Sequence, residues 1–175
     1  MKTTSRWRLA LGAGVLCLGA TRVFAVEPDA GVNSPVVEVS YRNPGGFIDT
    51  DPDLRQRNDW LEELRRYVVQ RASRSVSADT RLVVMITDVQ RAGMVKPWRR
   101  TADGYLRFVR DATPPRIDLV FQLISPQGAV LKEGTRHLRD INFLGSITFH
   151  TGEPLAYEKN LIDDWLRQDF GAPQP

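Results

Sequence analysis

The chain has 175 residues, of which 42% are hydrophobic and 26% charged, and its formal net charge is +3. This length fits a single domain. The first 25 residues hold four of the 24 basic residues and none of the 21 acidic ones, so the remainder has 20 basic and 21 acidic residues, a net charge of −1. We therefore expect no nucleic-acid partner.

The first predicted segment is a secretory signal peptide over residues 1–25. A basic start precedes an uncharged apolar run over 9–20, and a signal-peptidase site follows that ends at Ala25. The run is too short to cross a bilayer. We expect cleavage after Ala25 and a periplasmic protein without a transmembrane segment, with an uncleaved anchor or a buried helix as the alternatives. Cys17 would be removed with the signal, so the mature domain folds without a disulfide.

A tether, a strand and a helix are predicted next. Residues 26–35 are rich in Pro, Gly and Asn, which indicates a flexible tether before a single domain over 36–172. Residues 36–42 alternate between apolar and other side chains, as a half-buried strand does. Asp51 is the expected N-cap of a helix that ends near Ser75. Its apolar residues recur at helical spacing: Trp60, Leu61, Leu64, Val68 and Ala72.

The remaining predicted elements are strands over 81–89, 105–110, 116–124 and 129–139, a loop over 90–104, and a helix that starts at Pro154. The nearly continuous apolar run over 81–89 predicts a central strand, parallel to strand 36–42 across the intervening helix. The turn sequence SPQG predicts a hairpin between the last two strands.

The predicted order is β-α-β-β-β-β-α. A mostly antiparallel sheet with both helices on one face accommodates this order. The predicted fold class is therefore α+β, a two-layer sandwich.

Four stretches are similar to a known family. They are TDVQRAGMVKPW (87–98), PPRIDLVFQL (114–123), LRDINFLG (138–145) and YEKNLIDDWLRQDF (157–170). Together they resemble the bacterial domain of unknown function 3016. The resemblance implies a secreted envelope protein and no established activity. The chain departs from the family at Gln90-Arg91-Ala92-Gly93, where the family has an acidic residue followed by Leu-Ala-Gly.

Few residues suggest catalysis or metal binding. The chain has two histidines, His137 on a predicted strand and His150 in an expected exposed loop, and no cysteine after cleavage. This is short of the ligands of a zinc site, and neither a nucleophile elbow nor a phosphate-binding loop occurs. We expect no cofactor and no metal.

A non-enzymatic binding or scaffolding module of the cell envelope is the favoured interpretation. One alternative is an envelope hydrolase or other enzyme that uses Asp88, Glu158 and a histidine in one concave pocket. The other is a small hydrophobe carrier with a cavity between helices and sheet.

An aromatic residue among cations marks a candidate partner site. The candidate residues are Arg91, Lys96, Trp98, Arg99 and Arg100. Such a group suits an envelope protein or an anionic envelope component through charge and stacking. In the competing interpretation, favoured by the usual burial of tryptophan, Trp98 folds onto the core and the arginines are solvated.

Glu158 lies in the apolar stripe of the last predicted helix. A buried lone carboxylate is costly, so it is expected either to reach the rim or to be paired. Arg116, at the start of a predicted strand, is the expected partner in a structural ion pair between helix and sheet, and Arg139 is the alternative.

Overall fold

The computed structural model describes residues 36–49, 53–101, 104–146, 150 and 152–171. The predicted signal peptide over 1–25 and the predicted tether over 26–35 lie outside the described residues.

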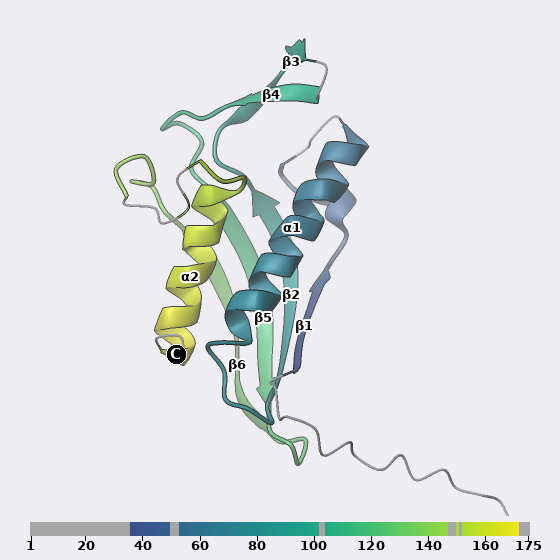
Figure 1. Cartoon of the computed structure of the whole chain (residues 1–175), viewed down its shortest axis with the longest axis vertical. Helices are drawn as coiled ribbons and strands as arrows, with labels where there is room; N and C mark the ends of the chain where they lie inside the picture. Colours follow the sequence, from purple (N-terminus) through teal and green to yellow (C-terminus); the bar gives the residue numbers. More distant parts are fainter. Residues whose placement is uncertain (1–35, 50–52, 102–103, 147–149, 151, 172–175) are drawn as a thin grey trace, which may run out of the picture. The chain divides into compact units, whose positions relative to one another are not determined.

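A four-stranded sheet forms one layer of the domain (Figure 1). The first two strands are parallel, and the other two pairings are antiparallel. In spatial order the strands are β1 (Val36–Tyr41), β2 (Arg81–Gln90), β5 (Arg116–Ile124) and β6 (Val130–Arg139). The predicted α+β class with a mostly antiparallel sheet is confirmed.

Two helices, α1 (Leu54–Ala72) and α2 (Ala156–Phe170), cover one face of this sheet (Figure 1). Asp53, rather than the predicted Asp51, is the N-cap of α1, because its carboxylate accepts the N–H of Arg55 at 2.9 Å. The apolar stripes of both helices are buried against the sheet, as the helical period requires. These buried residues are Trp60, Leu61, Leu64, Val68, Ala72, Leu161, Ile162, Trp165 and Leu166.

The alternation along β5 decides which side chains face the helices. Ile117, Leu119 and Phe121 are buried in the core, and Phe121 makes an edge contact with Trp165 at 5.6 Å between ring centroids. Because successive strand residues point to opposite faces, Arg116 lies on the face of the sheet away from the helices.

A second, two-stranded sheet occupies most of the segment that we predicted as a loop over 90–104. β3 (Met94–Thr101) pairs antiparallel with β4 (Gly104–Phe108), which corresponds to the predicted strand 105–110. The described order is therefore one strand longer than predicted. Gly93 separates β3 from β2 with φ of 77°, and a side chain there would clash with the carbonyl of Phe108. Glycine is the residue that tolerates this conformation.

The C-terminal end of α2 is held against β6 by charge pairs. Arg136 donates two hydrogen bonds of 2.8 Å to the carboxylate of Asp169, and Lys132 lies 2.8 Å from the same carboxylate. Such bidentate contacts fix orientation. They position α2 so that its N-terminal end lies beside hairpin β3–β4 (Figure 1).

Candidate functional site

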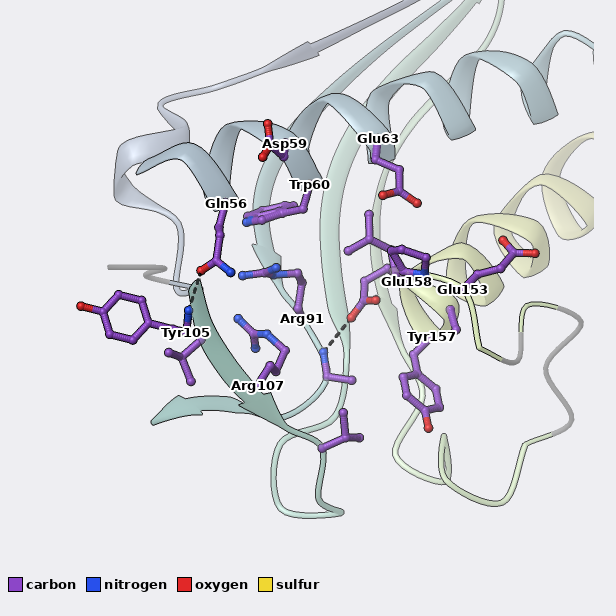
Figure 2. A pocket seen from close by; sticks show the side chains of 16 residues that line it. Gln56, Asp59, Trp60, Glu63, Arg91, Tyr105, Arg107, Glu153, Tyr157 and Glu158 are labelled. Atoms are coloured by element: carbon purple, nitrogen blue, oxygen red, sulfur yellow. Dashed lines mark hydrogen bonds between the residues drawn. The ribbon is translucent and has the colours of Figure 1, made fainter. Parts of the chain in front are cut away.

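A pocket of about 510 Å³ lies where α1, hairpin β3–β4 and the N-terminal end of α2 meet (Figure 2). Its charged lining residues are Asp59, Glu63, Arg91, Arg107, Glu153 and Glu158. Its apolar and aromatic lining residues include Trp60, Val95, Val109, Pro154, Leu155 and Tyr157. The pocket is next to the hairpin, which differs from the cavity between helices and sheet that a hydrophobe carrier requires.

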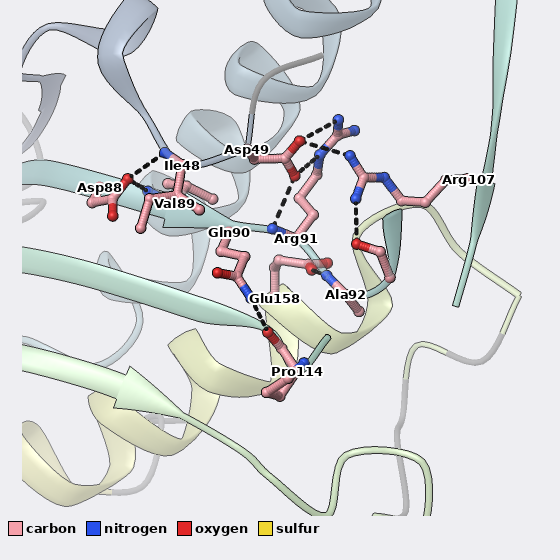
Figure 3. Close-up of polar contacts among 11 residues, drawn as sticks. Ile48, Asp49, Asp88, Val89, Gln90, Arg91, Ala92, Arg107, Pro114 and Glu158 are labelled. Atoms are coloured by element: carbon pink, nitrogen blue, oxygen red, sulfur yellow. Dashed lines mark hydrogen bonds and ion pairs between the residues drawn. The ribbon is translucent and has the colours of Figure 1, made fainter. Parts of the chain in front are cut away.

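Asp49 holds two of the arginines that line this pocket, as Figure 3 shows. Its carboxylate, only 5% exposed, accepts hydrogen bonds from Nε of Arg91 at 2.9 Å and from a terminal nitrogen of Arg107 at 2.7 Å. Burial alone would raise the pKa of Asp49, but the hydrogen bonds and charge of Arg91, together with the charge of Arg107, lower it below its ordinary value. Asp49 is therefore ionised and joins the hairpin to the segment before α1.

Both guanidinium groups are held by further contacts. The guanidinium carbon of Arg91 lies 4.4 Å from the ring centroid of Trp60, a cation–π contact that Figure 2 shows. Arg107 also donates to the carbonyl of Gly93 at 2.9 Å. Burial, followed by the repulsion of Arg91, lowers the pKa of Arg107. Positive charge is thus concentrated on the hairpin side of the pocket.

Glu158 faces inward from the first turn of α2 and is only 3% exposed. One carboxylate oxygen accepts the backbone N–H of Ala92 at 2.6 Å (Figures 2 and 3). Burial raises the pKa of Glu158, and hydrogen bonds from the N–H groups of Ala92 and Glu158, with the charges of Arg91 and Arg107, oppose that rise only in part. Glu158 is thus bound to the backbone that leads into the hairpin.

The predicted ion pair between Glu158 and Arg116 is not formed. Arg116 pairs with Asp88 and lies 3.8 Å from Asp118, both on the face of the sheet away from the helices. The alternation of β5 places Arg116 on that face, whereas Glu158 approaches from the helices. Arg139 is opposite Arg116 in the register of β5 and β6, so it is on the same outer face and is not the partner either.

The structure brings three of the five predicted partner residues together on the exposed side of hairpin β3–β4. Trp98 is 77% exposed, so the interpretation that it folds onto the core is wrong. Nζ of Lys96 lies 5.9 Å from the ring centroid of Trp98 and 4.7 Å from that of Phe108, and Arg99 lies 5.6 Å from Phe108. We define the outer hairpin surface as Lys96, Trp98, Arg99, Leu106 and Phe108.

The other two predicted partner residues are not placed on this surface. Arg91 lies in the pocket, with its side chain 12% exposed and bonded to Asp49. Only the backbone of Arg100 is described, where it pairs with Tyr105 of β4. Tyr105 and Arg107 of β4 line the pocket. Leu106 and Phe108 alternate with them along the strand, so they point to the opposite face of the hairpin.

The groups that the enzyme alternative needs are not brought into one pocket. Asp88 accepts the N–H groups of Ile48 and Val89 and pairs with Arg116. Nδ1 of His137 lies 3.0 Å from Asp118 on the outer face of the sheet. Of the described residues that line the pocket with Glu158, none is Asp88 or a histidine.

His150 differs from its expected exposure. Its side chain is only 14% exposed, and its Nε2 lies 2.9 Å from the hydroxyl of Tyr67 and 3.3 Å from Asp163. Within the described part of the chain, no group of three or more His, Cys, Asp or Glu side chains could hold a metal ion. None of the described helices has the length and apolar character needed to cross a membrane.

A known family model matches most of the chain. The profile described as "Protein of unknown function (DUF3016)" matches residues 35–168. The chain belongs to the DUF3016 family. The matched range includes every residue that lines the pocket and the whole outer hairpin surface.

More distant comparisons add no functional information. No curated protein matches this DUF3016 chain significantly. A crystal structure of a minor lipoprotein from Acinetobacter baumannii is 12% identical, with 78% of this chain and 88% of that chain covered and a TM-score of 0.25. A likeness at that TM-score supports no inference about this chain.

Proposed function

We propose that this DUF3016 protein is a non-catalytic binding module of the periplasm that docks onto an anionic lipid surface through the outer hairpin surface. The observation that carries this proposal is the 77% exposure of Trp98 beside Lys96 and Arg99. Trp98 and Leu106 are both exposed large apolar residues on this surface, and an apolar patch rimmed by polar residues is typical of an interaction site.

The chemistry of these side chains favours lipid headgroups. Tryptophan has an apolar body and a polar N–H, which suits the boundary between headgroups and acyl chains. Each lysine or arginine near an anionic membrane contributes about 1 kcal/mol of attraction. The net charge of −1 outside the first 25 residues gives no general attraction, so binding depends on the local cations of the hairpin.

Export to the periplasm is supported by the basic start and the apolar run of residues 1–25. We expect the mature protein to begin at Val26. N-terminal sequencing of protein recovered from the periplasm tests this expectation, and recovered protein that begins at Met1 would contradict it.

Vesicle sedimentation tests the docking. Protein 26–175 should bind vesicles of phosphatidylglycerol and phosphatidylcholine, but not vesicles of phosphatidylcholine alone. The double variant Lys96→Ala with Arg99→Ala loses two cations, each of which contributes about 1 kcal/mol of attraction. Its affinity for the anionic vesicles should therefore be about thirtyfold weaker. Arg66→Ala is a matched control, because Arg66 is a 70% exposed cation on α1. Absence of binding to the anionic vesicles, or an equal effect of the control, would overturn the proposal.

A further inference from the structure

We infer that the pocket between the hairpin and the helices binds a zwitterionic amino compound with an apolar body, of the class of short apolar peptides. The carboxylate of such a ligand meets Arg91 and Arg107, and its ammonium group meets Glu63 and Glu153. This site lies on the opposite face of the hairpin from the proposed lipid surface, so the two proposals stand or fall separately.

Opposite walls of the pocket carry opposite charge. In Figure 2, Arg91 and Arg107 lie on one side, and Glu63 and Glu153 lie on the other. We define these pairs as the basic wall and the acidic wall. A ligand with one charge of each sign at its two ends complements both walls, whereas a simple anion or cation is repelled by one of them.

Each wall is held in place by a buried group of the opposite sign. The guanidinium groups of the basic wall meet on Asp49, at 2.9 Å and 2.7 Å. The carboxylates of the acidic wall meet on Nζ of Lys159, at 2.9 Å for Glu63 and 3.1 Å for Glu153. Glu153 also lies 3.5 Å from Nδ1 of His150. In both places two like charges meet one buried counter-charge, so each wall keeps its sign.

The surface between the two walls is apolar. Val95, Val109, Pro154, Leu155 and Tyr157 line it, and the volume of about 510 Å³ is within the range of small-molecule sites. Glu158 lies at the floor, where its carboxylate oxygen is occupied by the N–H of Ala92. The space therefore suits an apolar side chain between two charged ends.

The backbone at the pocket gives a second, independent indication. Leu155 has φ of 57° and ψ of 28° directly before α2. A leucine rarely adopts this left-handed conformation, and such strain is concentrated at ligand sites. Here it brings Leu155 and Pro154 into the wall of the pocket.

Calorimetry with leucyl-leucine and its two singly blocked forms tests the inference. At about pH 7, where an α-amino group is mostly protonated, the free dipeptide should bind to protein 26–175. N-acetyl-leucyl-leucine lacks the cation and leucyl-leucine amide lacks the anion, and each should bind about tenfold more weakly. Absence of binding by the free dipeptide, or equal binding of all three, would overturn the site.

Variants assign each end of the ligand to a wall. Glu63→Gln should abolish the preference for the free dipeptide over its N-acetyl form and keep the preference over the amide. Arg107→Gln should do the reverse. If Arg107→Gln does not fold, the Glu63→Gln result alone decides, because Glu63 is a partly exposed residue on α1. Trp98→Ala, on the other face of the hairpin, should leave all three affinities unchanged, and a loss there would contradict the assignment to the pocket.

Discussion

Both faces of hairpin β3–β4 carry cationic side chains, but the cation of one face is bonded within the fold and those of the other are not buried. On the pocket side, Arg107 is bonded to Asp49 and to the carbonyl of Gly93. On the outer side, the cations of Lys96 and Arg99 lie beside aromatic rings, and Trp98 is exposed. The cation of the inner face is therefore fixed by the fold, whereas those of the outer face remain accessible to a partner.

This difference separates stability from binding within one hairpin. A buried charge that loses its partner is left desolvated and uncompensated, which costs several kcal/mol. An exposed charge that is removed is replaced by water at little cost. We therefore expect substitutions on the pocket side to lower the free energy of unfolding, and substitutions on the outer side to change binding alone.

The largest expected effect is that of Asp49→Ala. Because the substitution leaves Arg91 and Arg107 without their shared carboxylate, it should lower the free energy of unfolding by about 3–5 kcal/mol, measured in urea. Glu38→Ala is the control, because Glu38 pairs with Arg81 on an exposed part of the sheet and its loss should leave the urea midpoint nearly unchanged. Equal effects of the two substitutions would contradict the inner network.

A second, smaller effect is that Asp49 and Glu158 make the free energy of unfolding depend on pH in opposite directions. The raised pKa of Glu158 means that the folded state holds the carboxyl proton more tightly than the unfolded state does. The stabilisation that this gives is fully present below the ordinary pKa of 4.5, and it is lost as the pH rises through the pKa of the folded state. The lowered pKa of Asp49 acts in reverse, with stability present above the ordinary pKa of 3.8 and lost in acid.

Urea titrations of Glu158→Gln between pH 4 and pH 7 check this sign. Relative to the variant, the unchanged protein should lose stability as the pH rises, by about 1.4 kcal/mol for each unit by which the pKa is raised. The measured quantity is the change with pH of the difference in unfolding free energy between the two proteins. Any cost of the amide that does not depend on pH cancels in this change. A constant difference across the range would show that Glu158 titrates normally.

A third test asks whether Arg116 belongs to the network around Glu158. The structure places Arg116 with Asp88 on the other face of the sheet, so the losses from Glu158→Ala and Arg116→Ala should add within about 0.5 kcal/mol. The pair Arg116→Ala and Asp88→Ala should instead show a coupling of about 1 kcal/mol. A coupling of that size between Glu158 and Arg116 would restore the ion pair that the sequence predicted.

The four strands of the main sheet and both helices were predictable because their side chains follow the period of 2 or 3.6 residues. The runs over 81–89 and 116–124 correspond to β2 and β5. β3 was missed because its sequence, MVKPWRRT, holds three cations and a proline and has no alternation. Its partner β4, and not its own pattern, makes it a strand.

The inward position of Glu158 was predictable from its place in the apolar stripe, but its partner was not identified correctly. The alternation of Ile117 and Leu119 already indicated that Arg116 faces away from the helices. The contact with the N–H of Ala92 had no sequence signal, since a backbone donor has no side-chain identity. Likewise, only the folded hairpin brings Arg107 and Asp49 together.

The smallest expected effect on stability is that of Trp98→Phe on the outer face. Outside residues 1–25 the chain has three tryptophans, of which Trp60 and Trp165 are buried and Trp98 is exposed. Trp98 should therefore account for most of the fluorescence that acrylamide quenches. Anionic vesicles should shift its emission to shorter wavelength, because the indole leaves water for the headgroup region. Trp98→Phe should abolish this shift and change the free energy of unfolding by only about 0.5 kcal/mol or less. An emission shift that persists in the variant would place the contact on another face, and the outer hairpin surface would then lose its role.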